Sequence, residues 1–177
     1  RIPSSKTIES WYELTPEQFA FSLKAPQRVT HFAKLQNCGD TMNYLFGVIQ
    51  GLEHKLGPLL FQLPPSFKKD AQILSAFLQE LPSGIRAAFE FRHDSWFDDE
   101  IFESLRGHDA ALCIAESEKL CTPAVTTAPF GYLRLRDRAY GSDELARWAR
   151  TAARTEWKDT FVYFKHEEEG KGAAFGQ

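Results

Sequence analysis

The chain has 177 residues, of which 43% are hydrophobic, and a formal net charge of −3, which suits one globular domain with a substantial core. The near-balanced charge gives no global electrostatic reason to expect binding to nucleic acid or to a membrane surface. The longest apolar runs are a handful of residues, far short of the roughly 20 needed to span a bilayer.

Short apolar runs alternate along the chain with amphipathic segments. We expect a polar helix around Trp11, and then six strands at residues 19–24, 56–63, 87–93, 110–116, 131–137 and 161–166. Helical spacing between the strands predicts helices at residues 41–55, 70–81, 98–106 and 142–154. Regular alternation of short strands and helices predicts parallel strands joined by right-handed crossovers.

The two faces of the strands favour a barrel over an open, doubly wound sheet. In residues 87–93 one face holds the bulky Phe89 and Phe91, and the other holds Ala88, Glu90 and Arg92. Residues 19–24 show the same division. A strand covered by helices on both faces would be apolar on both, whereas small and then charged residues suit a narrow interior that opens at one end. The predicted fold class is α/β, a TIM-barrel-like (β/α) barrel.

The last inward position of each predicted strand is polar or charged. In chain order these residues are Lys24, Gln62, Glu90 with Arg92, Glu116, Arg134 with Arg136, and Lys165 or His166. Glu116 belongs to the set if Leu112 and Ile114 share its inward face. Because barrel enzymes build their sites at the carboxyl ends of the strands, we expect these side chains to converge at a common mouth.

Two interpretations of this charged set remain open. The residues could form an internal salt-bridge network with no chemical role. They could instead form a ligand site, which the charge balance favours: five cations, Lys24, Arg92, Arg134, Arg136 and Lys165, face only two carboxylates, Glu90 and Glu116. Surplus buried cations require an anion, and guanidinium groups bind phosphate or carboxylate through paired hydrogen bonds.

Other site types have less support. No HExxH, HxH or DxD spacing is present, and neighbouring arginines would repel a divalent cation, so we expect neither metal nor cofactor. Cys38, Cys113 and Cys121 form no CxxC pair, which argues against a disulfide framework. With no signal peptide at the start of the sequence, we expect a cytoplasmic protein. His31 follows the first strand and could reach the mouth, although a lone histidine in a loop is more often a surface or capping residue.

Several stretches together resemble the YecE-like family, also called domain of unknown function 72. They are residues 21–26 with Thr30 and His31, residues 57–65, residues 89–93 with Ser95 and Trp96, residues 132–136, and residues 163–167. The resemblance implies a TIM-barrel-like fold and no established activity. The chain departs from the common pattern at Arg136-Asp137, where many members have His-Gly, and at Lys165-His166, where many have Asn-Asn or Asn-Asp.

The resemblance also implies that residues 1–177 form a single barrel domain lacking the first two strands and the last helix, as a fragment of a longer barrel. A fold that closes with fewer strands is the alternative. If two strands are missing, the open seam exposes apolar surface and sheet edges, and self-association is expected.

The main functional hypothesis is a site for an anionic small molecule at the strand ends. Arg92, Arg134, Arg136 and His166 would bind the anion, and Gln62 would orient it. Trp96 would cover it, although packing of Trp96 against a helix is the more common arrangement. Lys24 and Lys165 would stabilise developing negative charge, and Glu90 would be the acid or base if the protein is an enzyme. The alternatives are a non-catalytic module that binds an anion or a nucleic-acid backbone, and a metal-dependent nuclease or isomerase argued from fold analogy alone.

Overall fold

A computed structural model describes residues 2–117, 120–136 and 140–164. Its elements, in chain order, are α1 (Ser5–Leu14), β1 (Phe21–Lys24), the π-helical turn η1 (Arg28–Phe32), α2 (Gly39–Ile49), the 3-10 segment η2 (Gln50–Lys55), β2 (Leu56–Gln62), α3 (Ala71–Gln79), β3 (Ala87–Glu90), η3 (Asp94–Trp96), α4 (Asp99–Arg106), β4 (Ala111–Ser117), β5 (Leu120–Cys121), β6 (Phe130–Leu135), α5 (Ser142–Ala152) and β7 (Asp159–Phe164).

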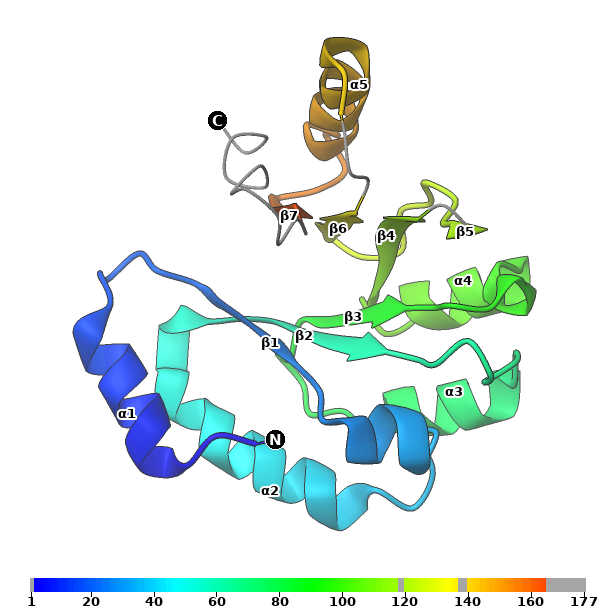
Figure 1. The fold of residues 1–177 in the computed structure, drawn as a ribbon. Coiled ribbons are helices and arrows are strands. Elements are labelled where there is room, and N and C mark those ends of the chain that lie inside the picture. The colour runs from blue at the N-terminus through cyan, green and yellow to red at the C-terminus, as the bar shows by residue number, and fades with distance from the viewer. Residues whose placement is uncertain (1, 118–119, 137–139, 165–177) are drawn as a thin grey trace.

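The strands form one curled sheet in the order β1-β2-β3-β4-β6-β7. Each neighbouring pair along this path is parallel, and the short β5 pairs antiparallel with β4. The curl brings β6 and β7 across from β1 (Figure 1). Ser22 of β1 and Tyr132 of β6 therefore meet, with their hydroxyl oxygens 2.9 Å apart. The architecture is an α/β fold with a parallel, half-barrel sheet.

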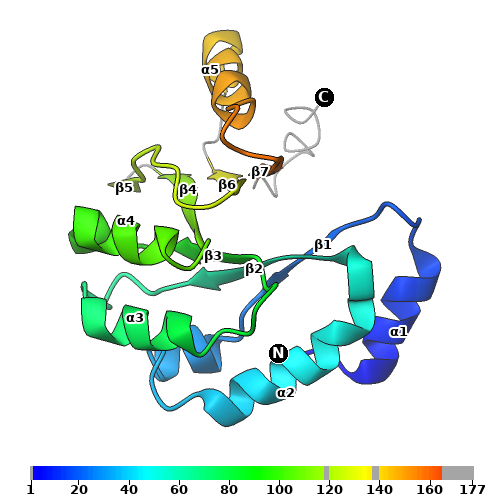
Figure 2. The same ribbon diagram turned by 180° about the vertical axis from the view of Figure 1, so that it is seen from behind.

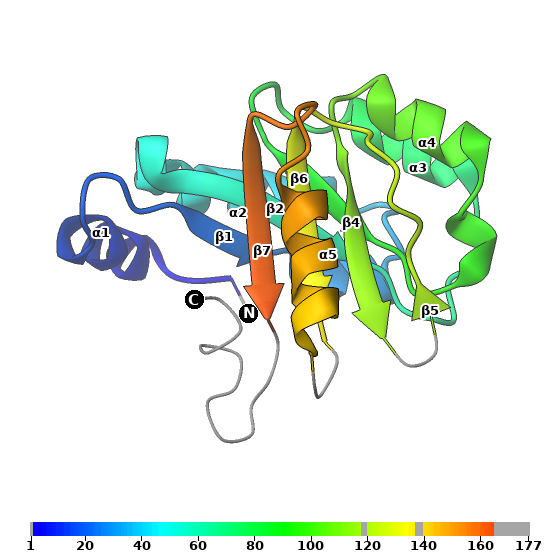
Figure 3. The same ribbon diagram turned by 90° about the horizontal axis from the view of Figure 1, so that it is seen from above.

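The helices lie outside the curl. Helices α2, α3 and α4 cover the outer face of β1 to β3, and α5 lies over the outer face of β6 (Figures 1 and 2). Seen from above, the arrowheads of β4 and β7 point the same way (Figure 3). Strand β6 lies between them and is parallel to both, so the three carboxyl ends share one rim of the sheet. Side-chain caps begin several helices; Asp70, for example, accepts a hydrogen bond from the Ile73 amide at the start of α3.

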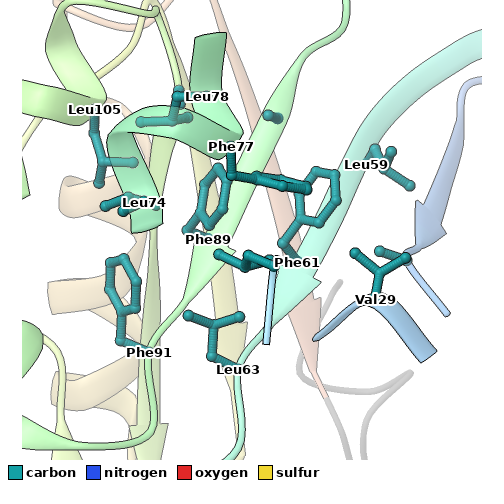
Figure 4. Packing of buried hydrophobic residues seen from close by; sticks show 14 of the residues in the cluster. Val29, Leu59, Phe61, Leu63, Leu74, Phe77, Leu78, Phe89, Phe91 and Leu105 are labelled. Carbon is teal, nitrogen blue, oxygen red and sulfur yellow. The ribbon is translucent and has the colours of Figure 1, made fainter. Parts of the chain in front are cut away.

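An aromatic core fills the layer between β2, β3 and helices α3 and α4 (Figure 4). Phe61 and Phe89 stack with ring centroids 5.1 Å apart. Phe77 of α3 meets the Phe61 ring edge-on at the same centroid distance, 5.1 Å. Burial of large rings in offset and edge-on contacts gives this layer most of its stabilisation. The prediction that the bulky residues of β3 face the helices is confirmed.

The inner face of the sheet carries smaller side chains. Ala88, Ala111, Cys113 and Ala115 pack there with Leu60, Ala128, Phe130 and Tyr132. A concave surface leaves little room, so small residues at the centre allow the strands to curl tightly. The predicted division of β3 into a small, charged face and a bulky face is therefore present in the structure.

Three of the differences between the structure and the predicted elements are informative. The helix expected at 41–55 is α2 followed by η2, and inside η2 Glu53 leaves the helical path with a positive φ of 48°. The strand expected at 87–93 ends at Glu90. The antiparallel β5 was not predicted, since a two-residue strand shows no hydrophobic period. Within the described residues, no helix has the length and apolar character to cross a membrane.

Candidate functional site

Gln62 and Glu90 lie side by side at the carboxyl ends of β2 and β3. They are register partners in the parallel pair, so both side chains leave the sheet on the same inner face. Both are almost fully buried, with 4% and 1% of their surface exposed. The Gln62 Nε2 donates to both carboxylate oxygens of Glu90 at 2.8 Å. Gln62 thereby fixes the orientation of the buried carboxylate.

Three arginines surround that carboxylate, and we call Arg92, Arg134 and Arg136 the arginine cluster. The Arg92 Nε donates to Glu90 Oε1 at 3.1 Å. Arg134 donates through Nη1 to Glu90 Oε2. The Arg136 Nη1 lies 3.7 Å from Glu90 Oε1, an ion pair longer than a hydrogen bond. The cluster side chains keep 15–31% of their surface exposed, so they join the buried carboxylate to the open rim.

The small residues of β4 explain how Arg134 reaches Glu90. Strand β4 lies between β3 and β6 in the sheet, and Ala115 is the register partner of Arg134. Cys113 and Ala115 both belong to the buried inner cluster. Because these side chains are short, the Arg134 guanidinium can pass over β4 and pair with a carboxylate two strands away.

Lys24, at the end of β1, extends the network toward the edge of the sheet. Its Nζ donates to the Gln62 Oε1 at 2.7 Å. The Gln62 amide therefore accepts from a cation on one side and donates to an anion on the other. Side chains from β1, β2, β3 and β6, far apart in sequence, meet at one rim of the sheet.

The Glu90 carboxyl is held in its ionised form. Burial raises its pKa, but the charge of Arg134, the Gln62 hydrogen bonds and the charge of Arg92 outweigh burial, and the pKa lies below its ordinary value. Glu90 is therefore an anion at neutral pH and has no proton to give. Its oxygens already accept hydrogen bonds from Gln62, Arg92 and Arg134. This arrangement suits an anchor for the arginines better than a general acid.

A small cavity of about 190 Å³ adjoins the cluster. Its lining residues come from the carboxyl ends of β3, β4 and β6 and from around β5: Pro65, Glu90, Phe91, Arg92, Ala115, Leu120, Thr122 and Arg136. The cavity offers two guanidinium groups and the Glu90 carboxylate that pairs with them, on otherwise mostly apolar walls. Hydrogen bonds and ion pairs are stronger in such surroundings than in bulk water.

A larger cavity, of about 530 Å³, lies at the opposite rim and shows no comparable charge surplus. Arg86 and Asp159 both line it and pair with each other, with Nη1 and Oδ2 3.1 Å apart. We therefore place the candidate site at the carboxyl ends, where the cations outnumber the carboxylate, and not at the larger hollow.

His31 lies in the loop that follows β1, the position from which we expected that it could reach the mouth. It is partly buried in η1 directly after β1, and its Nδ1 lies 2.9 Å from the Thr30 hydroxyl oxygen. Burial and the charges of Lys24 and Arg92 lower the pKa of His31. Sequence periodicity does not reveal the π-helical turn that holds His31 in the loop after β1.

Two expected residues lie elsewhere. Trp96 has no exposed surface; its Nε1 donates to the Phe67 carbonyl at 2.7 Å and its ring stacks on Phe91. It therefore belongs to the helix-side core, as the helix-packing alternative expected, and the expectation that it covers a ligand is wrong. Glu116 accepts from Trp148 and Arg147 of α5. Its neighbours Leu112 and Ile114 pack on the helix side, so the condition for its inward face fails.

Lys165 and His166 lie outside the described residues. The remaining expected residues, Lys24, Gln62, Glu90, Arg92, Arg134 and Arg136, are brought together by the contacts above. No group of three histidine, cysteine, aspartate or glutamate side chains with metal-site geometry occurs within the described ranges.

One protein family model matches residues 1–176, and its description is "Protein of unknown function DUF72". Among curated proteins, the chain is 29% identical over 97 residues to the UPF0759 protein YecE of Escherichia coli (strain K12), covering 54% of this chain and 36% of YecE. It is 30% identical over 110 residues to the UPF0759 protein YunF of Bacillus subtilis (strain 168), covering 58% of this chain and 39% of YunF. These matches span little more than a third of either relative.

Two solved structures are similar over nearly the whole chain. The crystal structure of a DUF72 family protein from Thermotoga maritima MSB8 matches with a TM-score of 0.87 and 26% sequence identity, covering 99% of this chain and 77% of that one. A DUF72 family protein from Enterococcus faecalis V583 matches with a TM-score of 0.84 and 18% identity, covering 98% and 78%. The second likeness supports the fold alone.

Proposed function

The chain belongs to the DUF72 family of proteins of unknown function, and from this premise we propose that its arginine cluster binds a small anionic molecule. The observation that carries the proposal is the charge balance: three guanidinium groups share one buried carboxylate beside a cavity. A network that served only stability would be better balanced, because uncompensated charge in a partly buried position is costly. An anionic phosphate or carboxylate group supplies the missing charge.

Each residue has a role in this proposal. Arg92 and Arg136, which line the cavity, contact the anion directly, and Arg134 supports them from β6. Glu90 holds the guanidinium groups in place, and Gln62 holds Glu90. The proposal thus moves Glu90 from acid or base to anchor, because its pKa is lowered and its oxygens are occupied.

We also propose the finer fold assignment, a TIM-barrel-like barrel in which further strands complete the curl between β7 and β1. The similar Thermotoga maritima structure supports it, since this chain covers 77% of that protein's length. Closure on that side would place Lys24 of β1 further inside the mouth. In barrels of this kind, the carboxyl ends of the strands carry the site.

Titration calorimetry with inorganic phosphate at pH 7.5 tests the binding proposal. The parent protein and an Arg106→Ala variant should bind phosphate equally, because Arg106 pairs with Glu103 on the exposed face of α4. Arg92→Ala and Arg136→Ala should each weaken binding about tenfold or more, the expected effect of losing a charge-assisted contact of about 1.5–3 kcal/mol. Equal binding by all four proteins would refute the proposal.

A further inference from the structure

The charges of the arginine cluster indicate how many negative charges its ligand carries. Arg92, Arg134 and Arg136 are paired with a single carboxylate, that of Glu90. Arginine stays protonated at physiological pH, and the pKa of Glu90 is lowered. Counted over the residues that the structure describes, the cluster therefore carries two positive charges more than negative ones. Lys24 hydrogen-bonds the Gln62 amide at the same rim and is not part of this count.

Arg136 is the guanidinium least committed to Glu90. Its Nη1 is 3.7 Å from the carboxylate, whereas Arg92 is within hydrogen-bond distance at 3.1 Å. Burial, together with the charge of Arg92, lowers the pKa of Arg136, although the charge of Glu90 raises it. The guanidinium groups therefore repel each other in partly desolvated surroundings. A ligand with two negative charges would relieve that repulsion, whereas one charge would leave a cation uncompensated.

The cavity limits the size of the group that can be held. Its volume is only about 190 Å³, which suits a single phosphate group better than a bulky ligand. Arg92 and Arg136 line it together with the Glu90 carboxylate that pairs with them, and its remaining walls are Pro65, Phe91, Ala115, Leu120 and Thr122. A guanidinium matches two oxygens of a phosphate at once.

We propose that the ligand of this site is a dianionic phosphate monoester of a small molecule, with its phosphate between Arg92 and Arg136. This inference rests on the proposed function and narrows it from anions in general to one class. A monocarboxylate is the excluded alternative. The doubly charged phosphate satisfies the two-charge surplus, and its ester substituent extends from the cavity toward the rim where Lys24 and His31 lie.

The test compares methyl phosphate, sulfate and acetate by titration calorimetry. The second pKa of a phosphate monoester is about 6, so between pH 7.5 and pH 5.0 the dianion falls from nearly all of the ligand to about a tenth. Methyl phosphate should then bind about tenfold more weakly at pH 5.0. Sulfate is a tetrahedral dianion at both pH values and corrects for titration of the protein, including His31. Acetate at pH 7.5 should bind at least tenfold more weakly than sulfate.

An Arg136→Gln variant is compared with the parent protein, because it lowers the positive charge surplus of the arginine cluster from two to one. It should lose most of the preference for sulfate over acetate. If methyl phosphate follows sulfate through the pH change, or if acetate equals sulfate in the parent protein, the dianion inference is wrong while anion binding stands. If none of the three anions binds, the proposed function itself fails.

Discussion

Replacing Glu90 with glutamine removes the negative charge at the centre of the arginine cluster and keeps nearly the same side-chain volume. The glutamine amide still fits beside Gln62, but three guanidinium groups then face each other without a carboxylate. Breaking a buried ion pair by removing one partner costs about 3–5 kcal/mol. Because the arginine side chains are 15–31% exposed, we expect the free energy of unfolding to fall by an amount at the lower end of this range, about 3 kcal/mol.

Urea unfolding followed by tryptophan fluorescence measures this loss. With a slope of roughly 2 kcal/mol per molar urea, the midpoint should fall by roughly 1.5 M. Glu103→Gln is the control, because Glu103 forms an exposed pair with Arg106 and surface pairs contribute little. Added sulfate should restore part of the loss in the Glu90→Gln variant. A loss below about 1 kcal/mol would show that the arginines do not depend on Glu90, and the anchoring argument would fail.

Three further predictions follow from the same structure. Because folding lowers the pKa of Glu90, the ionised carboxylate contributes fully to the free energy of unfolding above its unfolded pKa of about 4.3, and this contribution is lost as pH falls through the folded pKa. Urea unfolding measured from pH 6 to pH 3 should therefore show a smaller loss of stability with acid for Glu90→Gln than for the parent. Gly131→Ala should cost about 1–3 kcal/mol in thermal unfolding, because the new Cβ would lie 2.5 Å from the Trp157 ring, whereas Gly47→Ala, with nothing within 4 Å, should stabilise α2; equal effects would contradict the packing. Trp96→Phe should lower the free energy of unfolding by about 1–3 kcal/mol, because it leaves the buried Phe67 carbonyl without its donor. Phosphate affinity should not change, and a tenfold change in that affinity would show that Trp96 contributes to the site after all.

Period-two reasoning located much of the candidate site, because a strand's faces alternate strictly. Glu90 and Arg92 sit on the same side as the small Ala88, and that pattern alone placed them inside the curl. The same logic failed for Glu116, where both faces of β4 are apolar. Nothing in the sequence says that Cys113 and Ala115 face inward while Leu112 and Ile114 face the helices. Only tertiary packing decides that choice.

Loop residues were the least predictable part of the site. His31 reaches the neighbourhood of Lys24 because of a π-helical turn, and positive φ angles at Lys34, Leu35 and Asn37 bend the chain that follows. None of these residues carries a sequence signal for that geometry. The ligand-covering role of Trp96 failed for a related reason: the 3-10 turn of η3 directs the ring into the core, where the alternative of helix packing expected it. Local backbone geometry, which has no simple period, sets where such side chains point.

The passage of Arg134 over β4 has a mechanical consequence. Strands β3 and β6 share no backbone hydrogen bonds, because β4 lies between them. The Glu90–Arg134 ion pair nevertheless connects them directly across the concave side of the sheet. A ligand that draws Arg134 away from Glu90 breaks this ion pair, whereas a ligand held by Arg92 and Arg136 keeps it. Amide hydrogen exchange in β6 and β7 should therefore become faster on binding if the ligand takes Arg134, and should not become faster if Arg92 and Arg136 hold the ligand. This measurement does not require the natural ligand to be known.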